Sequence, residues 1–211
     1  MEYGLYVVTD DRPTMNSPLA DRVRQAIEGG ADIVQYRDKT STDRVMLETA
    51  LELRKVTYDY GIPLIINDRP DIAIACMADG LHVGQDDLPV PQVKKRSDFS
   101  GIIGVSVGSP EEAIRAEKEG ADYVALSPLF STPTKTDAGP GHGLAVLREI
   151  RNQVSVPIVA IGGIGRENVS DVIAHGADGV AVISAVFGKE DVRSAARELK
   201  FLITAAKSRH P

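Results

Sequence analysis

One short phrase recurs four times along this 211-residue chain, each time at the end of a segment with helical spacing. The copies are Gly30–Ile33, Ala78–Leu81, Gly120–Tyr123 and Gly176–Val180. A glycine can adopt the left-handed backbone that ends a helix, and the β-branched or aromatic residues that follow suit a buried strand. The repetition therefore indicates that one helix-to-strand unit is reused around a single sheet.

Eight strand-like runs alternate with segments of helical spacing along the whole chain. We expect strands at Leu5–Thr9, Ile33–Arg37, Pro63–Asn67, Gly80–Val83, Ile102–Ser106, Tyr123–Leu126, Pro157–Ile161 and Gly179–Ile183. The expected helices include Leu19–Glu28, Thr42–Tyr60, Pro110–Glu119, Leu144–Asn152, Glu167–His175 and Asp191–Lys207. Eight short parallel strands with right-handed crossovers close into a ring more readily than they spread into an open doubly wound sheet. We predict an α/β fold, a single-domain (β/α)8 TIM barrel over residues 1–211, with the open sheet as the alternative.

Composition narrows the classes of function. The net charge of −6 comes from 30 acidic and 24 basic residues without long blocks, and there is no Trp, which argues against a nucleic-acid-binding face. We expect no membrane span, because no stretch of eighteen residues lacks charge, and a cytoplasmic location, because the first residues do not resemble a secretory leader. Cys76 is the only cysteine, which excludes an internal disulfide. The sequence leaves open whether the chain forms a homo-oligomer.

The carboxyl ends of the strands should carry the chemistry, because barrels of this kind place their sites there. The second strand ends in Gln35-Tyr36-Arg37-Asp38-Lys39, and a two-residue alternation puts Gln35, Arg37 and Lys39 on one face. Two cations on one rim attract an anion. The alternative is a solvated pair at a loop.

Acidic residues follow the next two strands. Asp68 comes directly after the third strand, and Asp86 and Asp87 follow the fourth. Two carboxylates on neighbouring strand ends suit Mg²⁺, which completes its shell with waters and phosphate oxygens. Aspartate also caps helices and starts turns, so a structural role remains the alternative for each.

Two short motifs stand at the ends of the last two strands. Gly162-Gly163 and Ile183-Ser184 lie where barrels often bind phosphate through backbone N–H groups, although turns alone would also use them. The long polar stretch Ser131–Gly143 follows the sixth strand and is expected to form a lid. Of the four histidines, three are assigned to the core or the surface, and His142 in this stretch would approach a substrate only if the stretch closed.

Taken together, the motifs resemble the thiamine phosphate synthase family over essentially the whole chain. They are Tyr6–Asp10, Gln35–Lys39, Ile66–Arg69, Gly80–Asp87, Gly104–Ser106, Thr132–Lys135, Ala160–Ile164 and Val182–Ala185. The resemblance implies a barrel transferase that joins hydroxymethylpyrimidine diphosphate to a thiazole phosphate and releases pyrophosphate, with Mg²⁺ as cofactor.

The resemblance also implies roles for individual residues. Those expected to hold the pyrimidine diphosphate are Gln35, Arg37, Lys39, Asn67 and Ser106, with Lys135 on its pyrophosphate. Asp68 and Asp87 would bind Mg²⁺. The thiazole phosphate would lie against Thr132, Thr134, Gly163, Ile183 and Ser184. Arg37, Lys39, Ser106 and Lys135 would take part in catalysis.

Two other functions fit the same fold. A thiazole tautomerase of the same superfamily would share the phosphate site, but that branch resembles Gly-x-Ser-Val-His, and this chain has Gly108 where the histidine would stand. It also tends to have Cys where this chain has Thr134. A phosphate-binding barrel without catalytic activity is the second alternative.

Overall fold

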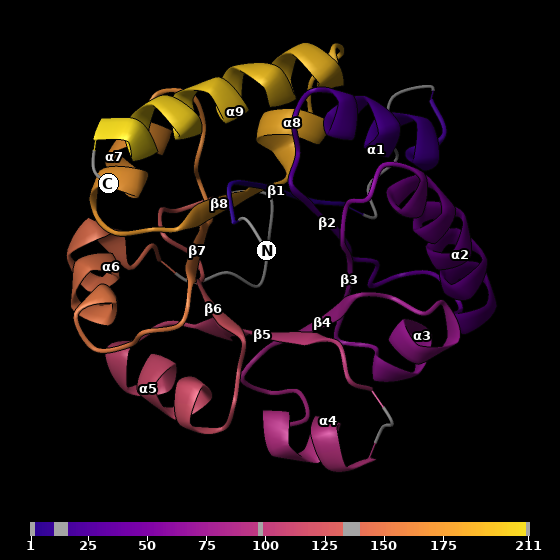
Figure 1. Cartoon of the computed structure of the whole chain (residues 1–211), viewed down its shortest axis with the longest axis horizontal. Helices are drawn as coiled ribbons and strands as arrows, with labels where there is room; N and C mark the ends of the chain where they lie inside the picture. The colour runs from indigo at the N-terminus through magenta and orange to yellow at the C-terminus, as the bar shows by residue number, and fades with distance from the viewer. Residues whose placement is uncertain (1–2, 11–16, 97–98, 133–139, 210–211) are drawn as a thin grey trace.

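Eight parallel strands form a closed ring in chain order (Figure 1). The structure is a computed structural model that describes residues 3–10, 17–96, 99–132 and 140–209. The strands are β1 (Leu5–Val8), β2 (Ile33–Tyr36), β3 (Leu64–Asn67), β4 (Gly80–Val83), β5 (Ile102–Val107), β6 (Tyr123–Leu126), β7 (Ile158–Ile161) and β8 (Gly179–Val182). The predicted barrel is confirmed, and each predicted strand agrees with the observed one to within one residue at either end.

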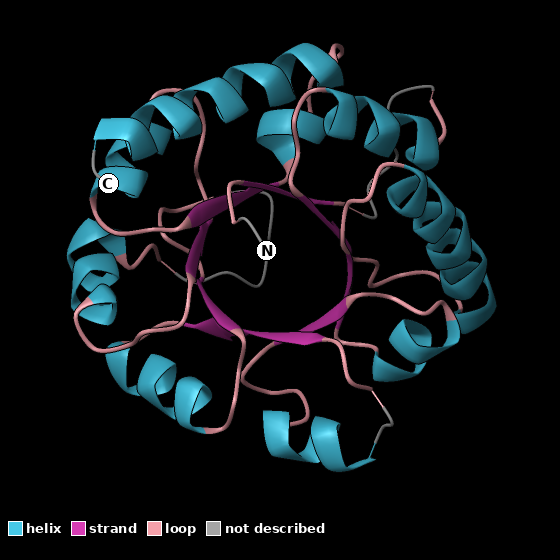
Figure 2. Cartoon of the chain, viewed as in Figure 1, coloured by secondary structure: helices cyan, strands magenta, loops and turns pink. Residues whose placement is uncertain are grey.

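Helices surround the ring on its outside (Figure 2). They are α1 (Leu19–Glu28), α2 (Asp43–Asp59), α3 (Pro70–Ala75), α4 (Val90–Arg96), α5 (Pro110–Lys118), α6 (Gly143–Arg151), α7 (Val169–Ala174), α8 (Ser184–Phe187) and α9 (Val192–Arg209). The sequence analysis gave no bounds for α3, α4 and α8, although α7, as short as α3, was expected at Glu167–His175. None of the helices in the described ranges combines the length and apolar character that a bilayer span would need.

Alternating strand residues divide the apolar side chains into two layers. Leu5 and Val7 of β1 point outward and pack beneath the helices, while Tyr6 and Val8 point into the ring. The inner layer is small and includes two tyrosines, Tyr6 and Tyr123, both almost fully buried. A side chain at an inward position therefore lies either in this inner layer or, near the end of its strand, at the mouth of the barrel.

The aspartate of each repeated phrase serves as a clamp at the amino end of the barrel. It precedes an even-numbered strand and accepts a backbone N–H bond from the start of the strand before it. The pairs are Asp32 with Leu5 (2.7 Å), Asp79 with Leu64 (2.8 Å), Asp122 with Ile103 (2.8 Å) and Asp178 with Ile158 (2.7 Å). Three of these four aspartate clamps also form an ion pair among the described residues: Asp32 with Lys200, Asp79 with Arg54 and Asp178 with Arg151. The repeat thus ties odd strands to even strands at the end opposite to the expected site.

Candidate active site

A cavity of about 220 Å³ opens at the carboxyl ends of β2 to β5. We call it the charged cavity, and its lining is Arg37, Lys39, Asn67, Asp68, His82, Gly84, Gln85, Asp86, Asp87 and Ser106. Six residues that the sequence analysis assigned to the pyrimidine diphosphate or Mg²⁺ come together here from four successive strand ends: Arg37, Lys39, Asn67, Asp68, Asp87 and Ser106. Gln35, assigned to the same substrate, does not line the cavity and is 5% exposed.

Arg37 is held at the end of β2 by Thr9, which is fully buried at the end of β1. The Thr9 hydroxyl accepts the Arg37 backbone N–H at 3.0 Å and donates to the Arg37 carbonyl at 3.2 Å. The backbone N–H of Thr9 in turn donates to the carbonyl of Gln35 at 2.9 Å. These bonds extend the pairing of β1 and β2 by one residue and fix the backbone position from which the Arg37 side chain extends.

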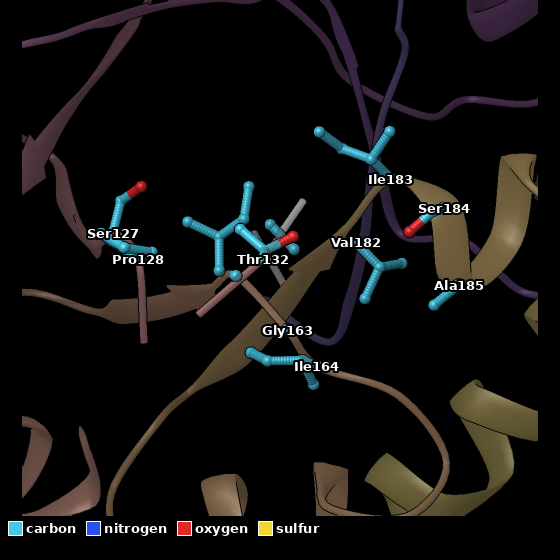
Figure 3. A pocket seen from close by; sticks show the side chains of 12 residues that line it. Ser127, Pro128, Thr132, Gly163, Ile164, Val182, Ile183, Ser184 and Ala185 are labelled. Atoms are coloured by element: carbon cyan, nitrogen blue, oxygen red, sulfur yellow. The ribbon is translucent and has the colours of Figure 1, made fainter. Parts of the chain in front are cut away.

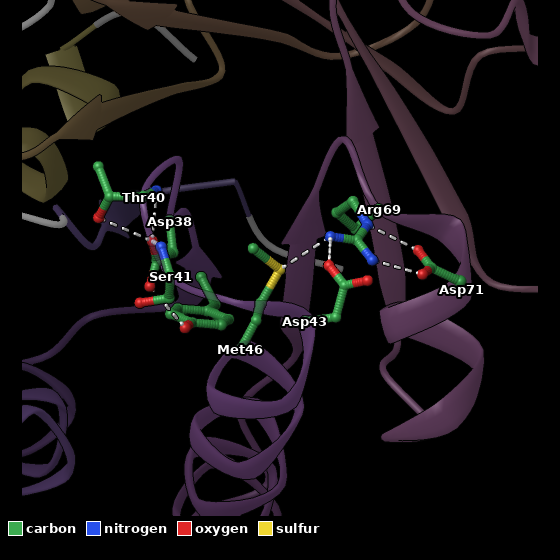
Figure 4. Close-up of polar contacts among 8 residues, drawn as sticks. Asp38, Thr40, Ser41, Asp43, Met46, Arg69 and Asp71 are labelled. Atoms are coloured by element: carbon green, nitrogen blue, oxygen red, sulfur yellow. Dashed lines mark hydrogen bonds and ion pairs between the residues drawn. The ribbon is translucent and has the colours of Figure 1, made fainter.

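Lys39 is carried by a tight turn built on Asp38. Asp38 Oδ1 accepts the backbone N–H groups of Thr40 and Ser41, both at 2.9 Å (Figure 4). Burial opposes ionisation of Asp38, but these hydrogen bonds outweigh it and hold the pKa of Asp38 below its ordinary value. An ionised Asp38 therefore stabilises the turn and, with it, the backbone of Lys39.

Two carboxylates share the floor of the charged cavity. Asp68 forms an ion pair with Lys39 and adopts a left-handed backbone with φ of 62°, and its N–H donates to the His82 carbonyl at 2.8 Å. Asp87 Oδ2 accepts the Gly84 N–H at 2.7 Å. Burial, and after it the nearby Asp68 carboxylate, raises the pKa of Asp87, because two negative charges are held close together away from water.

A metal ion here would depend on these two acids. In the part of the chain that the structure describes, no group of three or more His, Cys, Asp or Glu side chains is placed to hold a metal. Asp68 does not cap α3, since Arg69 is the residue before that helix. The helix-cap alternative for Asp68 is therefore wrong, and its carboxylate is directed to the cavity instead.

Arg69 anchors the strand end that carries Asp68. Its guanidinium donates to Asp71 at 2.9 and 2.6 Å and to Asp43 at 2.8 Å, so that it joins the first turns of α3 and α2 (Figure 4). Hydrogen bonds from Arg69 lower the pKa of Asp71. A left-handed residue that is not glycine persists only where its surroundings over-determine it, and this ion-pair cluster supplies such a restraint next to Asp68.

A second, narrower cavity of about 50 Å³ lies at the ends of β6, β7 and β8 (Figure 3). We call it the backbone-lined cavity, and its lining is Ser127, Pro128, Thr132, Ile161, Gly162, Gly163, Ile164, Ala181, Val182, Ile183, Ser184 and Ala185. No charged side chain is among these described lining residues, so an anion held here would rely on hydroxyl groups and backbone N–H groups.

Gly163 gives this cavity its shape. Its φ is 63°, and a Cβ atom there would lie 2.8 Å from Cβ of Phe130 and 2.9 Å from the carbonyl oxygen of Ser131. Thr132, Gly163, Ile183 and Ser184, all predicted from the sequence, line the cavity together. Thr134 and Lys135 lie outside the described residues, as does the greater part of the predicted lid.

Comparison with known proteins identifies the family of the chain that carries these two cavities. A sequence model described as thiamine monophosphate synthase matches residues 5–186. The chain belongs to the thiamine monophosphate synthase family. Thiamine-phosphate synthase of Methanoculleus marisnigri is 55% identical over 99% of each chain, and that of Methanoregula boonei is 50% identical over 100% of this chain and 97% of its own.

Solved structures agree with this assignment. Thiamine phosphate pyrophosphorylase from Pyrococcus furiosus superposes with a TM-score of 0.87 at 42% identity, covering 96% of each chain. A 3-hexulose-6-phosphate synthase superposes with a TM-score of 0.70 at 20% identity over 96% of this chain and 100% of its own, a likeness of fold alone. The family expected from the motifs is therefore confirmed, and the members of the thiamine monophosphate synthase family named here match this chain from end to end.

His82 is buried, as a core role predicts, but it also lines the charged cavity, which our sequence analysis did not expect. Its Nε2 lies 2.9 Å from Ser106 Oγ. The alternation along β4 could have revealed it: Leu81 and Val83 are outer-layer apolar residues, so His82 must face into the ring.

His142 is partly buried beside the end of β5. Its Nε2 lies 3.2 Å from the Ser127 carbonyl oxygen. A Cβ atom on Gly108 would lie 3.0 Å from the His142 ring. The absence of a side chain at position 108 therefore makes room for His142.

Proposed function

We propose that this chain is a thiamine-phosphate synthase, which joins hydroxymethylpyrimidine diphosphate to a thiazole phosphate and releases pyrophosphate. The observation that carries the proposal is the presence of two unlike cavities at one end of the barrel, one charged and one lined by backbone and hydroxyl groups. A reaction that joins two anionic molecules needs two such places side by side. The names of the relatives support the same activity.

The charged cavity is the proposed place of the pyrimidine diphosphate. Arg37 and Lys39 would neutralise the diphosphate, and Asn67 and Ser106 would orient it through hydrogen bonds. Gln35 would act from beneath, because it is buried under the cavity floor and bonded to Tyr6. Lys135, named by the family motif, is proposed to reach the pyrophosphate from the lid.

Asp68 and Asp87 are the residues proposed to hold Mg²⁺. The donor set fits this ion, because Mg²⁺ commonly takes one or two protein carboxylates and completes its shell with water and substrate phosphate oxygens. Burial and the nearby Asp68 carboxylate raise the pKa of Asp87, and Lys39 pairs with Asp68 as its counter-ion. When bound, Mg²⁺ would supply positive charge to the diphosphate leaving group.

The backbone-lined cavity is the proposed place of the thiazole phosphate. Thr132 and Ser184 offer hydroxyl groups, and Gly163 and Ile183 offer backbone at close approach. Thr134 is assigned to the same phosphate on the family motif. Binding by neutral groups would leave the positive charge of the site concentrated on the diphosphate that must depart.

The chemistry asked of the chain is mainly electrostatic. The electron-rich aminopyrimidine can share the positive charge that develops as its methylene separates from diphosphate, so little proton transfer is needed. Arg37 and Lys39 stabilise the charge that accumulates on the departing oxygen, and the second cavity aligns the thiazole nitrogen with the methylene carbon.

The direct test is to incubate the purified chain with both substrates and Mg²⁺ and to measure pyrophosphate and thiamine phosphate together. We expect equal amounts of the two products, and none when either substrate or Mg²⁺ is left out. A tautomerase would convert a thiazole carboxylate phosphate alone, and a binding protein would retain ligands without product. Either result, without thiamine phosphate from the complete mixture, contradicts the proposal.

A further inference from the structure

A chain of hydrogen bonds crosses the interior of the barrel beneath the charged cavity. Gln35 Nε2 donates to the Tyr6 hydroxyl at 2.8 Å, and the hydroxyls of Tyr6 and Tyr123 lie 2.9 Å apart. Tyr123 Oη is 2.9 Å from His82 Nδ1, and His82 Nε2 is 2.9 Å from Ser106 Oγ. The first four side chains are at most 6% exposed, whereas Ser106 opens into the cavity.

The donor at one end determines the direction of every bond in this polar chain. An amide nitrogen can only donate, so Tyr6 accepts from Gln35 and its own proton goes to Tyr123. Tyr123 then donates to His82 Nδ1, which leaves the imidazole proton on Nε2 for the bond to Ser106 Oγ. Ser106 Oγ accepts that bond, which leaves its own hydroxyl proton to be donated to another acceptor.

Burial keeps both tyrosine hydroxyls protonated, so that each can donate one hydrogen bond and accept another. Desolvation raises the pKa of Tyr6 and of Tyr123 well above their ordinary value, so both hydroxyls retain their protons at neutral pH. Each therefore has one proton to donate and lone pairs with which to accept.

Packing leaves the polar chain little freedom to rearrange. The Tyr123 ring lies between the rings of Tyr3 and His82, with centroids 5.3 and 5.5 Å away. It occupies the space beside Gly104 of β5, where a Cβ atom would lie 2.0 Å from Cζ of the ring. Gly104 thus makes room for the tyrosine whose hydroxyl meets His82.

We propose that Tyr6 and Tyr123 are positioning residues that hold His82 in the Nε2–H tautomer and so make Ser106 a hydrogen-bond donor to the pyrimidine diphosphate. The inference rests on the proposed function for the identity of that ligand. A hydroxyl that donates to an anionic oxygen forms a charge-assisted bond, which strengthens as negative charge builds up on the leaving group. Neither tyrosine lines the charged cavity, so each would act through His82 and Ser106.

The tautomer can be read directly by NMR of protein labelled with ¹⁵N in its four histidines, with the His82 signals assigned by their loss in His82→Gln. We expect His82 of the unmodified chain to carry its proton on Nε2 and to show an unprotonated Nδ1. In Tyr123→Phe, Nδ1 loses its donor, so we expect a mixture of the two tautomers. Because the measurement needs no substrate, it is independent of whether the proposed function is correct.

Kinetics provide the second readout. We expect Tyr123→Phe to lower kcat about tenfold, the equivalent of one hydrogen bond, with a smaller change in the KM for the pyrimidine diphosphate. Tyr3→Phe is the matched control, since its ring packs on Tyr123 but no hydrogen bond of its hydroxyl is found among the described residues. This control should leave both tautomer and kcat unchanged. Tyr6→Phe serves as a second variant if Tyr123→Phe does not fold.

Three results would overturn the inference. One is an Nδ1–H tautomer in the unmodified chain, and another is an unaltered tautomer in a folded Tyr123→Phe variant. The third is an equal loss of kcat in Tyr3→Phe, which would indicate a packing effect. If the unmodified chain makes no thiamine phosphate but shows the expected tautomers, the proposed function fails while the bond order in the barrel stands.

Discussion

The two ends of the barrel are built on opposite principles. At the amino end, the same device occurs four times: an aspartate before an even strand accepts one backbone N–H from the first or second residue of the strand before it. At the carboxyl end the groups that line the cavities change around the ring: polar and charged side chains gather on β2 to β5, while β6 to β8 offer backbone and hydroxyl groups.

This difference separates what folds the chain from what it does. A closed ring requires each strand to meet its neighbour in the same way, so a device that stabilises the ring can be repeated. A site that binds two different molecules has to break that repetition. Substitutions at the two ends should therefore affect different measurements, activity at one and the free energy of unfolding at the other.

The largest effect is expected for Asp87→Asn at the carboxyl end. Removing one of two carboxylates that would hold Mg²⁺ should lower kcat by about 10²- to 10³-fold, the usual cost of losing one charge-stabilising group. Unfolding should be little affected, because the Asp87 charge is disfavoured by burial and by Asp68. Initial rates over a series of Mg²⁺ concentrations, together with thermal unfolding, measure both.

Asp86→Asn is the matched control for that experiment. Asp86 also lines the charged cavity, but its side chain is exposed. Its variant should keep nearly normal rates at every Mg²⁺ concentration. If Asp86→Asn proves the damaging change and Asp87→Asn the harmless one, the assignment of the metal ligand is wrong.

A smaller loss is expected for Gly163→Ala in the backbone-lined cavity. The new Cβ would press on Phe130 and Ser131, and alanine disfavours the φ of 63°. A strain of about 1–3 kcal/mol, if expressed as displacement of this loop, predicts a rise of about tenfold in the KM for the thiazole phosphate. The KM for the pyrimidine diphosphate should stay within about twofold, as measured by steady-state kinetics with each substrate varied in turn.

Gly165→Ala tests whether that effect is local. Gly165 lies two residues away in the same loop, and a Cβ atom there would meet nothing within 4 Å. Its variant should bind both substrates normally. A similar rise in both variants would mean that the loop is sensitive to any change and would remove the special role of Gly163.

The same contrast explains how far the sequence could be interpreted without a structure. The repeated phrases and the alternation of apolar runs predict the closed barrel, because a repeated unit leaves a repeated pattern. Arg37, Lys39 and Asp68 were expected near one another from their positions after strands, and Asp87 was preferred to Asp86 on the family resemblance; all of them line one cavity. What could not be predicted depends on contacts across the ring.

His82 illustrates this limit. The alternation along β4 places it inside the ring, but only the structure shows that β6 brings Tyr123 to one ring nitrogen and β5 brings Ser106 to the other. Gln35 is a second example. The alternation along β2 puts it on one face with Arg37 and Lys39, but only the structure shows that its amide donates to the Tyr6 hydroxyl.

At the amino end, Asp32→Ala should be the most damaging of the clamp substitutions. Asp32 accepts the Leu5 N–H and pairs with Lys200 at 2.6 and 2.8 Å, and its side chain is 17% exposed. Loss of these partners should lower the free energy of unfolding by about 2–3 kcal/mol, as expected when part-buried donors are left unsatisfied. Denaturant unfolding measures the change. Folded Asp32→Ala protein should retain the kcat of the unmodified chain, and a loss of kcat in folded protein would contradict the separation of the two ends.

Asp122→Ala should produce the smallest change, and it separates the two contributions that each clamp makes. Asp122 accepts the Ile103 N–H at 2.8 Å, but within the described ranges no basic side chain forms an ion pair with it. Its removal should lower the free energy of unfolding by about 1 kcal/mol, the net value of one hydrogen bond. The difference between the Asp32 and Asp122 variants then measures what the lysine adds. If both variants lose the same free energy, the backbone bond alone accounts for the clamp, and the paired bases at the other three positions contribute little because water screens them.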